Sequence, residues 1–333
     1  MARWSTPEQE WAGTRTAELV RSLVDDAPAL EIDVQRGVAE ALIIDCGVAA
    51  RGSWEAGRRV AELAHGGMMR ATLGMTDVLG IPLPELVGDS WRPFRSIHGL
   101  QVSFALDEVD AAIRVSGPVR ACIDGLLHRP SDLVDGVCSW GVAIVEATRL
   151  PTADVVEAVA RRAGLRPEAL TLVVVPSNSL AGVAQLAGRL NECVVFTLDQ
   201  SMGLDPRCVV SILGAVPLAP CGGQGIPVVT QDDMIHYAGR ATMIVEAAPD
   251  WDLMAMARTL VFRSSPTYGR LFSEILAEAG GVFEAIPGLS DLNKIACITL
   301  VDRTTGRVAS AGAVDVKLLA FAFEQVGGGR HGR

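Results

Sequence analysis

The segment Trp140–Val175, WGVAIVEATRLPTADVVEAVARRAGLRPEALTLVVV, carries the clearest secondary-structure signals in the chain. Its mostly apolar start, Trp140 to Ala147, predicts a strand, and Thr152 to Ala163 predicts a helix that ends at Gly164. Leu170 to Val175 is an apolar run typical of a strand covered on both faces. This order of strand, helix and strand favours an α/β fold.

Periodicity and turn residues extend this pattern in both directions. Upstream, they predict helices over 6–24, from Gly52 to Gly66 and over 116–128, strands over 42–45, 97–106 and 109–115, and a loop-rich section over 74–93. Downstream, they predict helices over 179–198, 250–261 and 265–280, a Pro/Gly-rich crossover over 217–227, a strand over 241–247 and a hairpin around 302–306. We expect two α/β parts, 1–140 and 141–326, and a flexible tail over 327–333.

Composition narrows the class of protein. Of the 333 residues, 49% are hydrophobic and 20% are charged, which is typical of a globular chain. The net charge of −10 opposes binding to nucleic acid, and neither a secretion signal nor an apolar run of membrane-spanning length is evident, so we expect a cytoplasmic protein. Seven scattered cysteines without a C-x-x-C pair predict free thiols and no zinc site.

The predicted helix over 179–198 is the best candidate for chemistry. Most of its circumference is apolar, yet Gln185, Arg189 and Glu192 follow one another at i, i+4 and i+7, which places them on one stripe. A carboxylate beside a guanidinium could activate water if the stripe faces a cleft. Spacing alone is equally compatible with a solvent-facing stripe and a surface ion pair.

Other polar positions carry weaker signals. Ser264, Ser265 and Tyr268 lie at the N-terminus of a predicted helix, which could bind an anion, although helix capping explains the serines as well. Asp45 and Glu55 could face a ligand or serve as a cap and a surface charge. The histidines at 65, 98 and 236 have no metal-like spacing, so we expect no bound metal.

A set of short motifs follows in order along residues 40 to 320. They are Ile44-Asp45-Cys46-Gly47, Gly52-Ser53-Trp54-Glu55-Ala56-Gly57-Arg58, Ser116-Gly117-Pro118 with Arg120-Ala121, Gln185 through Arg189 to Glu192, Tyr268-Gly269, Thr305-Gly306 and Ala311-Gly312. Together they resemble the methenyltetrahydromethanopterin cyclohydrolase family, and the G-S-W-E-A-G-R stretch is the most specific of them.

The resemblance implies two α/β domains with a pterin pocket between them, a homotrimer, and no metal or redox cofactor. The implied reaction is reversible hydrolysis of a cationic methenyl bridge, a cyclic amidine, to the N5-formyl compound. The family's catalytic Arg and Glu match Arg189 and Glu192. The candidate substrate-binding residues are Gln185, Gln101, Ser116, Gly117, Pro118, Glu55, Ser264, Ser265 and Tyr268.

Several positions depart from the family pattern. The glutamine at 101 is followed by Val102-Ser103-Phe104 instead of Ala-Gly-Trp, an Asn-Asp pair becomes Asp232-Asp233, and Asp-Tyr-Gly-Lys becomes Thr267-Tyr268-Gly269-Arg270. Two further functions therefore stay open. One is a paralogue that opens or closes another N–C–N ring in a different pathway, such as one of specialised metabolism. The other is a non-catalytic pterin binder, which would need no base.

Overall fold

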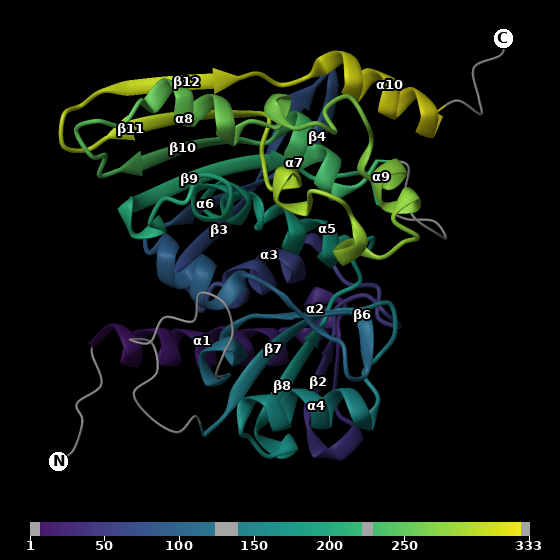
Figure 1. Ribbon diagram of the computed structural model, residues 1–333. Helices are drawn as coiled ribbons and strands as arrows, with labels where there is room; N and C mark the ends of the chain where they lie inside the picture. Colours follow the sequence, from purple (N-terminus) through teal and green to yellow (C-terminus); the bar gives the residue numbers. More distant parts are fainter. Residues whose placement is uncertain (1–6, 124–138, 222–228, 328–333) are drawn as a thin grey trace, which may run out of the picture. The chain divides into compact units, whose positions relative to one another are not determined.

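The computed structural model describes residues 7–123, 139–221 and 229–327 and divides into two compact units, each with a six-stranded sheet (Figure 1). Unit 1 comprises Met1–Ala71 and Phe94–Gln185, and unit 2 comprises Thr72–Pro93 and Leu186–Arg333. Both units mix helices and strands, so the predicted α/β class is confirmed. The expected boundary near residue 140 differs from this division, because strands on both sides of that residue share the sheet of unit 1.

The sheet of unit 1 has the strand order β1-β2-β8-β7-β6-β5. Its strands are β1 (Asp33–Arg36), β2 (Leu42–Asp45), β5 (Phe104–Leu106), β6 (Asp110–Ser116), β7 (Gly141–Glu146) and β8 (Leu170–Val174). Strand β8 pairs in parallel with both β2 and β7, and all five of its residues are buried. This central position explains its apolar composition and confirms the interpretation of Trp140–Val175.

The helices of unit 1 follow the predicted periodicity in most places. They are α1 (Pro7–Asp25), α2 (Ala27–Leu30), α3 (Trp54–Ala64), α4 (Ala153–Ala163) and α5 (Leu180–Ala187), with the 3₁₀ turns η1 (Val38–Glu40), η3 (Pro118–Cys122) and η4 (Pro167–Ala169). Ser53 caps α3 by accepting a bond from the Ala56 N–H, and Gly164 ends α4 at φ 64°. The predicted helix over 116–128 is only η3 within the described residues.

One segment of unit 1 contradicts the strand predicted over 97–106. Phe94–Gln101 forms a π-helix, η2, and only Phe104–Leu106 is extended. In η2 the Val102 N–H donates to the Ile97 carbonyl at 3.0 Å, five residues back. Apolar residues in a short segment fit a wide helix as well as a strand, so the pattern could not decide between them.

The sheet of unit 2 has the order β12-β11-β10-β9-β4-β3. Its strands are β3 (Met69–Val78), β4 (Ile81–Ser90), β9 (Val209–Pro217), β10 (Arg240–Val245), β11 (Cys297–Asp302) and β12 (Val308–Gly312). The loop-rich prediction for 74–93 is therefore wrong. Pro82 and Pro84 are tolerated in β4 because its pairing with β9 begins at Glu85.

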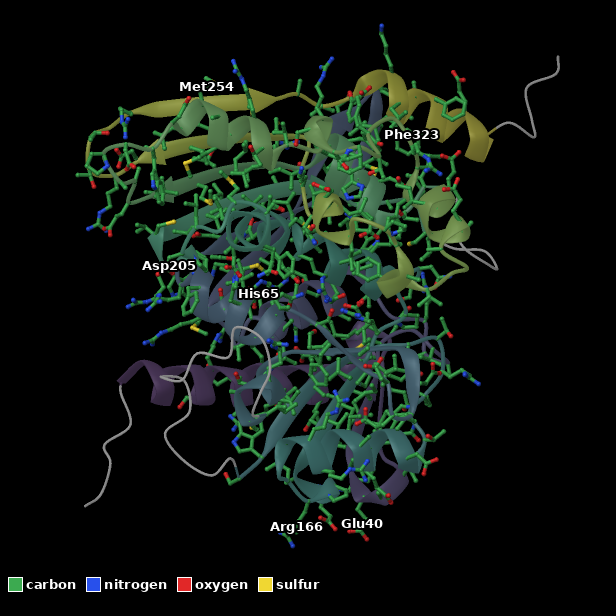
Figure 2. All side chains as sticks on the ribbon, viewed as in Figure 1. Glu40, His65, Arg166, Asp205, Met254 and Phe323 are labelled. Atoms are coloured by element: carbon green, nitrogen blue, oxygen red, sulfur yellow. The ribbon has the colours of Figure 1, made fainter. Side chains whose placement is uncertain are left out.

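The helical elements of unit 2 complete the chain. They are α6 (Leu190–Gln200), α7 (Gln231–Ala238), α8 (Leu253–Leu260), α9 (Phe272–Glu278) and α10 (Val316–Gly327), with the 3₁₀ turns η5 (Pro206–Cys208), η6 (Phe262–Ser264), η7 (Phe283–Ala285) and η8 (Leu289–Leu292). Helix α8 lies along β11 and β12, and its Met254 points outward (Figure 2). The hairpin predicted around 302–306 is confirmed by β11 and β12. Residues 328–333 of the predicted tail lie outside the described residues.

The structure bears on two expectations from the sequence, about membrane-spanning segments and about the cysteines. Of the helices that the structure describes, none is both long enough and apolar enough to cross a membrane. The expectation of free thiols is wrong for Cys122, which is disulfide-bonded. Spacing along a sequence does not reveal which thiols meet in the fold.

Candidate active site

The predicted helix over 179–198 is two helices rather than one. Helix α5 ends at Ala187, and α6 begins at Leu190 after a turn at Gly188 and Arg189. The Arg189 N–H donates to the Leu186 carbonyl at 2.9 Å, a three-residue bond that breaks the regular ladder. Glycine is a poor helix former, and no other residue in this stretch signals the break. The straight stripe expected for Gln185, Arg189 and Glu192 therefore does not exist.

Arg189 and Glu192 nevertheless form a close pair at the start of α6. Arg189 Nη2 lies 3.0 Å from Glu192 Oε1, and the two side chains are 15% and 9% exposed. This exposure excludes the fully solvated stripe that spacing alone allowed. A partly dry ion pair interacts more strongly than a surface pair, because less water screens it.

Charged side chains lie near Cys193, the residue after Glu192. Burial raises the pKa of its thiol, and the carboxylates of Glu192 and Asp232 raise it further against the opposing charge of Arg189. The thiol therefore stays protonated at neutral pH and is no nucleophile. Asp232, in the first turn of α7, contributes charge here that sequence reasoning did not assign to the site.

A second group of predicted residues lies buried in unit 1. Gln101 and Gln185 are each 1% exposed, as is Ser116, and their side-chain N and O atoms have no hydrogen-bond partner among the described residues. Gln101 ends η2, and the Gly117 N–H donates to the Leu100 carbonyl at 2.8 Å, which brings the end of β6 against η2. Buried polar groups rarely stay unsatisfied, so these side chains need a ligand or a water.

Gly117 and Pro118 determine the course of the backbone after β6. Gly117 has φ 92°, and a Cβ atom there would lie 3.0 Å from Ile144 Cγ1, so only glycine fits. Pro118 then starts η3, where its missing N–H costs nothing.

Glu55 is held by arginines of its own helix. Both of its oxygens accept bonds from Arg58 at 2.7 Å, and Oε1 also accepts one from Arg59 at 2.9 Å. The bonds from Arg58 hold the pKa of Glu55 below its ordinary value, against the effect of burial. These contacts favour the surface-charge interpretation of Glu55.

Asp45 closes the turn after β2. Its carboxylate accepts four backbone N–H bonds, from Gly47, Val48, Ala49 and Ala50, at 2.6 to 3.0 Å. Burial raises the pKa of Asp45, but these four donors outweigh it and hold the pKa below its ordinary value. Asp45 is thus a structural cap.

The anion site expected at Ser264, Ser265 and Tyr268 lacks its helix. Helix α9 begins only at Phe272, so these residues do not form its N-terminus. Ser264 Oγ donates to the Val261 carbonyl and accepts from the buried Lys294 Nζ at 3.0 Å.

The other two side chains of this group also have local partners. Ser265 Oγ pairs with Thr267 Oγ1 at 2.9 Å, and the Tyr268 hydroxyl donates to Asp315. Pro266 suggested a helix start, but here it leads into a turn.

His65 and His236 contact groups of the protein. His65 lies at the C-terminal end of α3, with Nδ1 2.9 Å from the Ala61 carbonyl (Figure 2). His236 stacks on Phe262 at 4.0 Å. Within residues 7–123, 139–221 and 229–327, His, Cys, Asp and Glu side chains do not gather in groups that could hold a metal ion.

Comparison with known proteins identifies the family. The family model for cyclohydrolase (MCH) matches residues 13–323. This chain belongs to that family. The methenyltetrahydromethanopterin cyclohydrolase of Methylobacterium nodulans is 31% identical over 331 residues, which cover 96% of this chain and 99% of the relative.

Relatives from both bacteria and archaea support the same assignment. The methenyltetrahydromethanopterin cyclohydrolase of a Methylobacterium species is 34% identical over 275 residues, or 80% of this chain and 84% of the relative. That of Methanocaldococcus jannaschii is 27% identical over 314 residues, or 92% of this chain and 95% of the relative. The resemblance drawn from short motifs is therefore confirmed, and the chain is a member of a hydrolase family that acts on cyclic amidines.

Residues that depart from the cyclohydrolase pattern have partners within their own unit. Ser103 Oγ accepts bonds from Arg114, and Phe104 lies beneath Arg162, whose Cζ is 5.4 Å from the ring centroid. Asp232, which replaces the Asn of the family pair, lies in the first turn of α7 and raises the pKa of the Cys193 thiol. Ser103 and Phe104 fill structural roles, so their change does not by itself indicate another ligand.

Proposed function

We propose that this protein is a cyclohydrolase that reversibly hydrolyses the cationic methenyl bridge of methenyltetrahydromethanopterin, or of its dephospho form, to the N5-formyl compound. The observation that carries the proposal is the largely buried ion pair of Arg189 and Glu192 in a member of the cyclohydrolase family. A non-catalytic binder would have no use for a carboxylate held in this way. A cytoplasmic location remains a prediction.

The chemistry requires a positioned base. The bridge carbon of the N–CH=N⁺ group is already electrophilic, so water can attack it once a proton is removed. Glu192 takes that proton, a C–O bond forms, and one C–N bond breaks as the departing nitrogen receives a proton. Water supplies the formyl oxygen, and one proton is released overall. Arg189 holds Glu192 Oε1 and so fixes the direction of the carboxylate.

Unit 1 carries a set of polar groups suited to binding a ligand. Gln101, Gln185 and Ser116 offer two amides and a hydroxyl that have no protein partner among the described residues. Leaving such a group unpaired costs about 1–3 kcal/mol each, so a polar ligand that satisfies them gains affinity. We assign these three residues, with the Gly117-Pro118 turn, to substrate binding.

We also propose that the protein forms a homotrimer, as the family resemblance implies. Along β9 the side chains alternate, with Ile212 buried and Leu213 50% exposed. Register through β10 and β11 places Leu213 in line with Ser310, and Val308, two residues before Ser310, shares that face and is 63% exposed. Light scattering of the unmodified protein and of Leu213→Asp tests this, and a monomer in both would contradict it.

The experiment that tests the function measures the methenyl chromophore. Unmodified protein should accelerate its loss, and Glu192→Gln should turn over at least about 10²-fold more slowly. Asp199→Asn, which removes a carboxylate elsewhere on α6, is the matched control and should keep normal turnover. No acceleration at micromolar protein would exclude this substrate, and a panel of other cyclic amidines would then test the paralogue. Near-normal turnover of Glu192→Gln would exclude Glu192 as the base.

A further inference from the structure

We propose that Asn191 is the positioning residue of the site, because it fixes the first turn of α6 to strands β4 and β9 and thereby sets where Arg189 and Glu192 lie. This inference rests on the proposed function. Asn191 itself does not touch the substrate in this proposal, and it acts through its two neighbours.

The contacts of Asn191 reach two strands. Its Nδ2 atom lies 3.1 Å from the Gly88 carbonyl and 3.0 Å from Ser90 Oγ, both on β4, and 3.4 Å from the Ile212 carbonyl on β9. The side chain is 2% exposed, so water does not compete for these bonds. The Asn191 amide has two N–H groups and three acceptors within reach on two strands, and these contacts hold the side chain in one position.

Two glycines, Gly214 and Gly239, leave space for the first turn of α6 to pack closely. Gly214 pairs with Gly88 across β9 and β4, and a Cβ at Gly214 would lie 2.3 Å from Asn191 Oδ1 and equally close to Leu190 Cδ2. A Cβ at Gly239 would lie 2.7 Å from Leu190 Cδ1. The absence of side chains at both positions lets the helix approach the sheet closely.

The first turn of α6 therefore has two sides. Residues advance about 100° around a helix, so Leu190 and Asn191 project away from the direction shared by Arg189 and Glu192. One side is seated on the sheet, and the other carries the ion pair. If the contact of Asn191 with the sheet shifts, the Glu192 carboxylate shifts by a similar distance. A displacement of about 1 Å costs roughly 10²-fold in rate.

The chemistry of Asn191 argues against a role in stability alone. Asparagine is an unfavourable residue inside a helix, and Asn191 Oδ1 has no hydrogen-bond partner among the described residues. A leucine, which branches in the same way, would avoid both problems, so the retained amide is explained by the position that it dictates.

A double-mutant cycle with a structural readout tests the proposal. Asn191→Leu should lower kcat at least about 10-fold with KM within about 2-fold, and the same change in Glu192→Gln protein should have almost no further effect. A crystal structure of Asn191→Leu should show the first turn of α6 shifted and the 3.0 Å contact of Arg189 with Glu192 changed. Ser90→Ala, which removes one acceptor, should cause a smaller loss in the same direction.

Thr197→Val is the matched control. Thr197 is also a buried polar residue of α6, five residues after Glu192, and its hydroxyl lies within bonding distance of the Cys193 and Asn293 carbonyls. It should lower the melting temperature and leave kcat unchanged. An equal kcat loss in Thr197→Val, equal losses in both backgrounds of the cycle, or an unshifted α6 would overturn the proposal. If the unmodified protein lacks turnover, the proposed function fails, and the crystal structure alone decides the role of Asn191.

Discussion

Replacing Asp45 by Asn should destabilise the protein by about 3–6 kcal/mol. The carboxylate accepts two N–H bonds at each oxygen, from Gly47 and Val48 at Oδ1 and from Ala49 and Ala50 at Oδ2. An amide keeps one oxygen and turns an NH₂ group toward the other two donors. Two bonds to a charged acceptor are lost, at roughly 1.5–3 kcal/mol each.

Urea unfolding at pH 7 measures this loss, with Asp33→Asn as the control. Asp33 pairs with Asp45 across β1 and β2 but is exposed, so its replacement should change the free energy of unfolding by less than about 0.5 kcal/mol. A loss below about 1 kcal/mol in Asp45→Asn would refute the assignment of the four bonds.

The same carboxylate predicts a direction for the pH dependence. The pKa of Asp45 is lower in the folded state than its ordinary value of 3.8, so the unfolded state binds more protons near that pH. Its contribution to stability is complete above the unfolded pKa and is lost as the pH falls toward the folded pKa. Between pH 5 and pH 3 the stability difference between the unmodified protein and Asp45→Asn should therefore shrink.

Three further changes have defined outcomes. Burial lowers the pKa of His236 from 6.5 to about 4, so stability should be lost by about 3 kcal/mol between pH 6.5 and pH 4; His236→Asn should show a smaller loss in urea titrations at each pH. Gln101→Leu should raise KM about 10-fold while raising the melting temperature, because it removes unsatisfied polar atoms; an unchanged KM would exclude Gln101 from binding. Gly57→Ala would place a Cβ 2.1 Å from the Ala181 carbonyl of α5, and calorimetry should show a loss of about 1–3 kcal/mol.

Local signals were sufficient for part of this fold. The β7-α4-β8 segment was predicted because strand burial, helix periodicity and Gly164 act over few residues. Strand β4 was missed because Pro82 and Pro84 are compatible with a strand only where the neighbouring strand does not need their N–H groups. That condition depends on a partner more than 120 residues away and leaves no local trace.

In the candidate site, too, contacts between residues close in sequence were predictable and contacts between distant residues were not. The pair of Arg189 and Glu192 was predictable, since three residues of helix bring the two side chains together. The turn at Gly188 was not, and neither was Asn191, whose acceptors lie 21 to 103 residues away. Lys294 was likewise missed because its Ser264 contact spans 30 residues.

The distribution of partners also bears on the substrate. Ser103 and Phe104, which depart from the family pattern, contact other side chains of their own unit. Gln101 and Ser116, which keep it, have no such partner among the described residues. A change of substrate would first alter the groups that bind it. If Gln101 or Ser116 binds the substrate, its replacement should raise KM for the pterin, and an unchanged KM would favour another cyclic amidine.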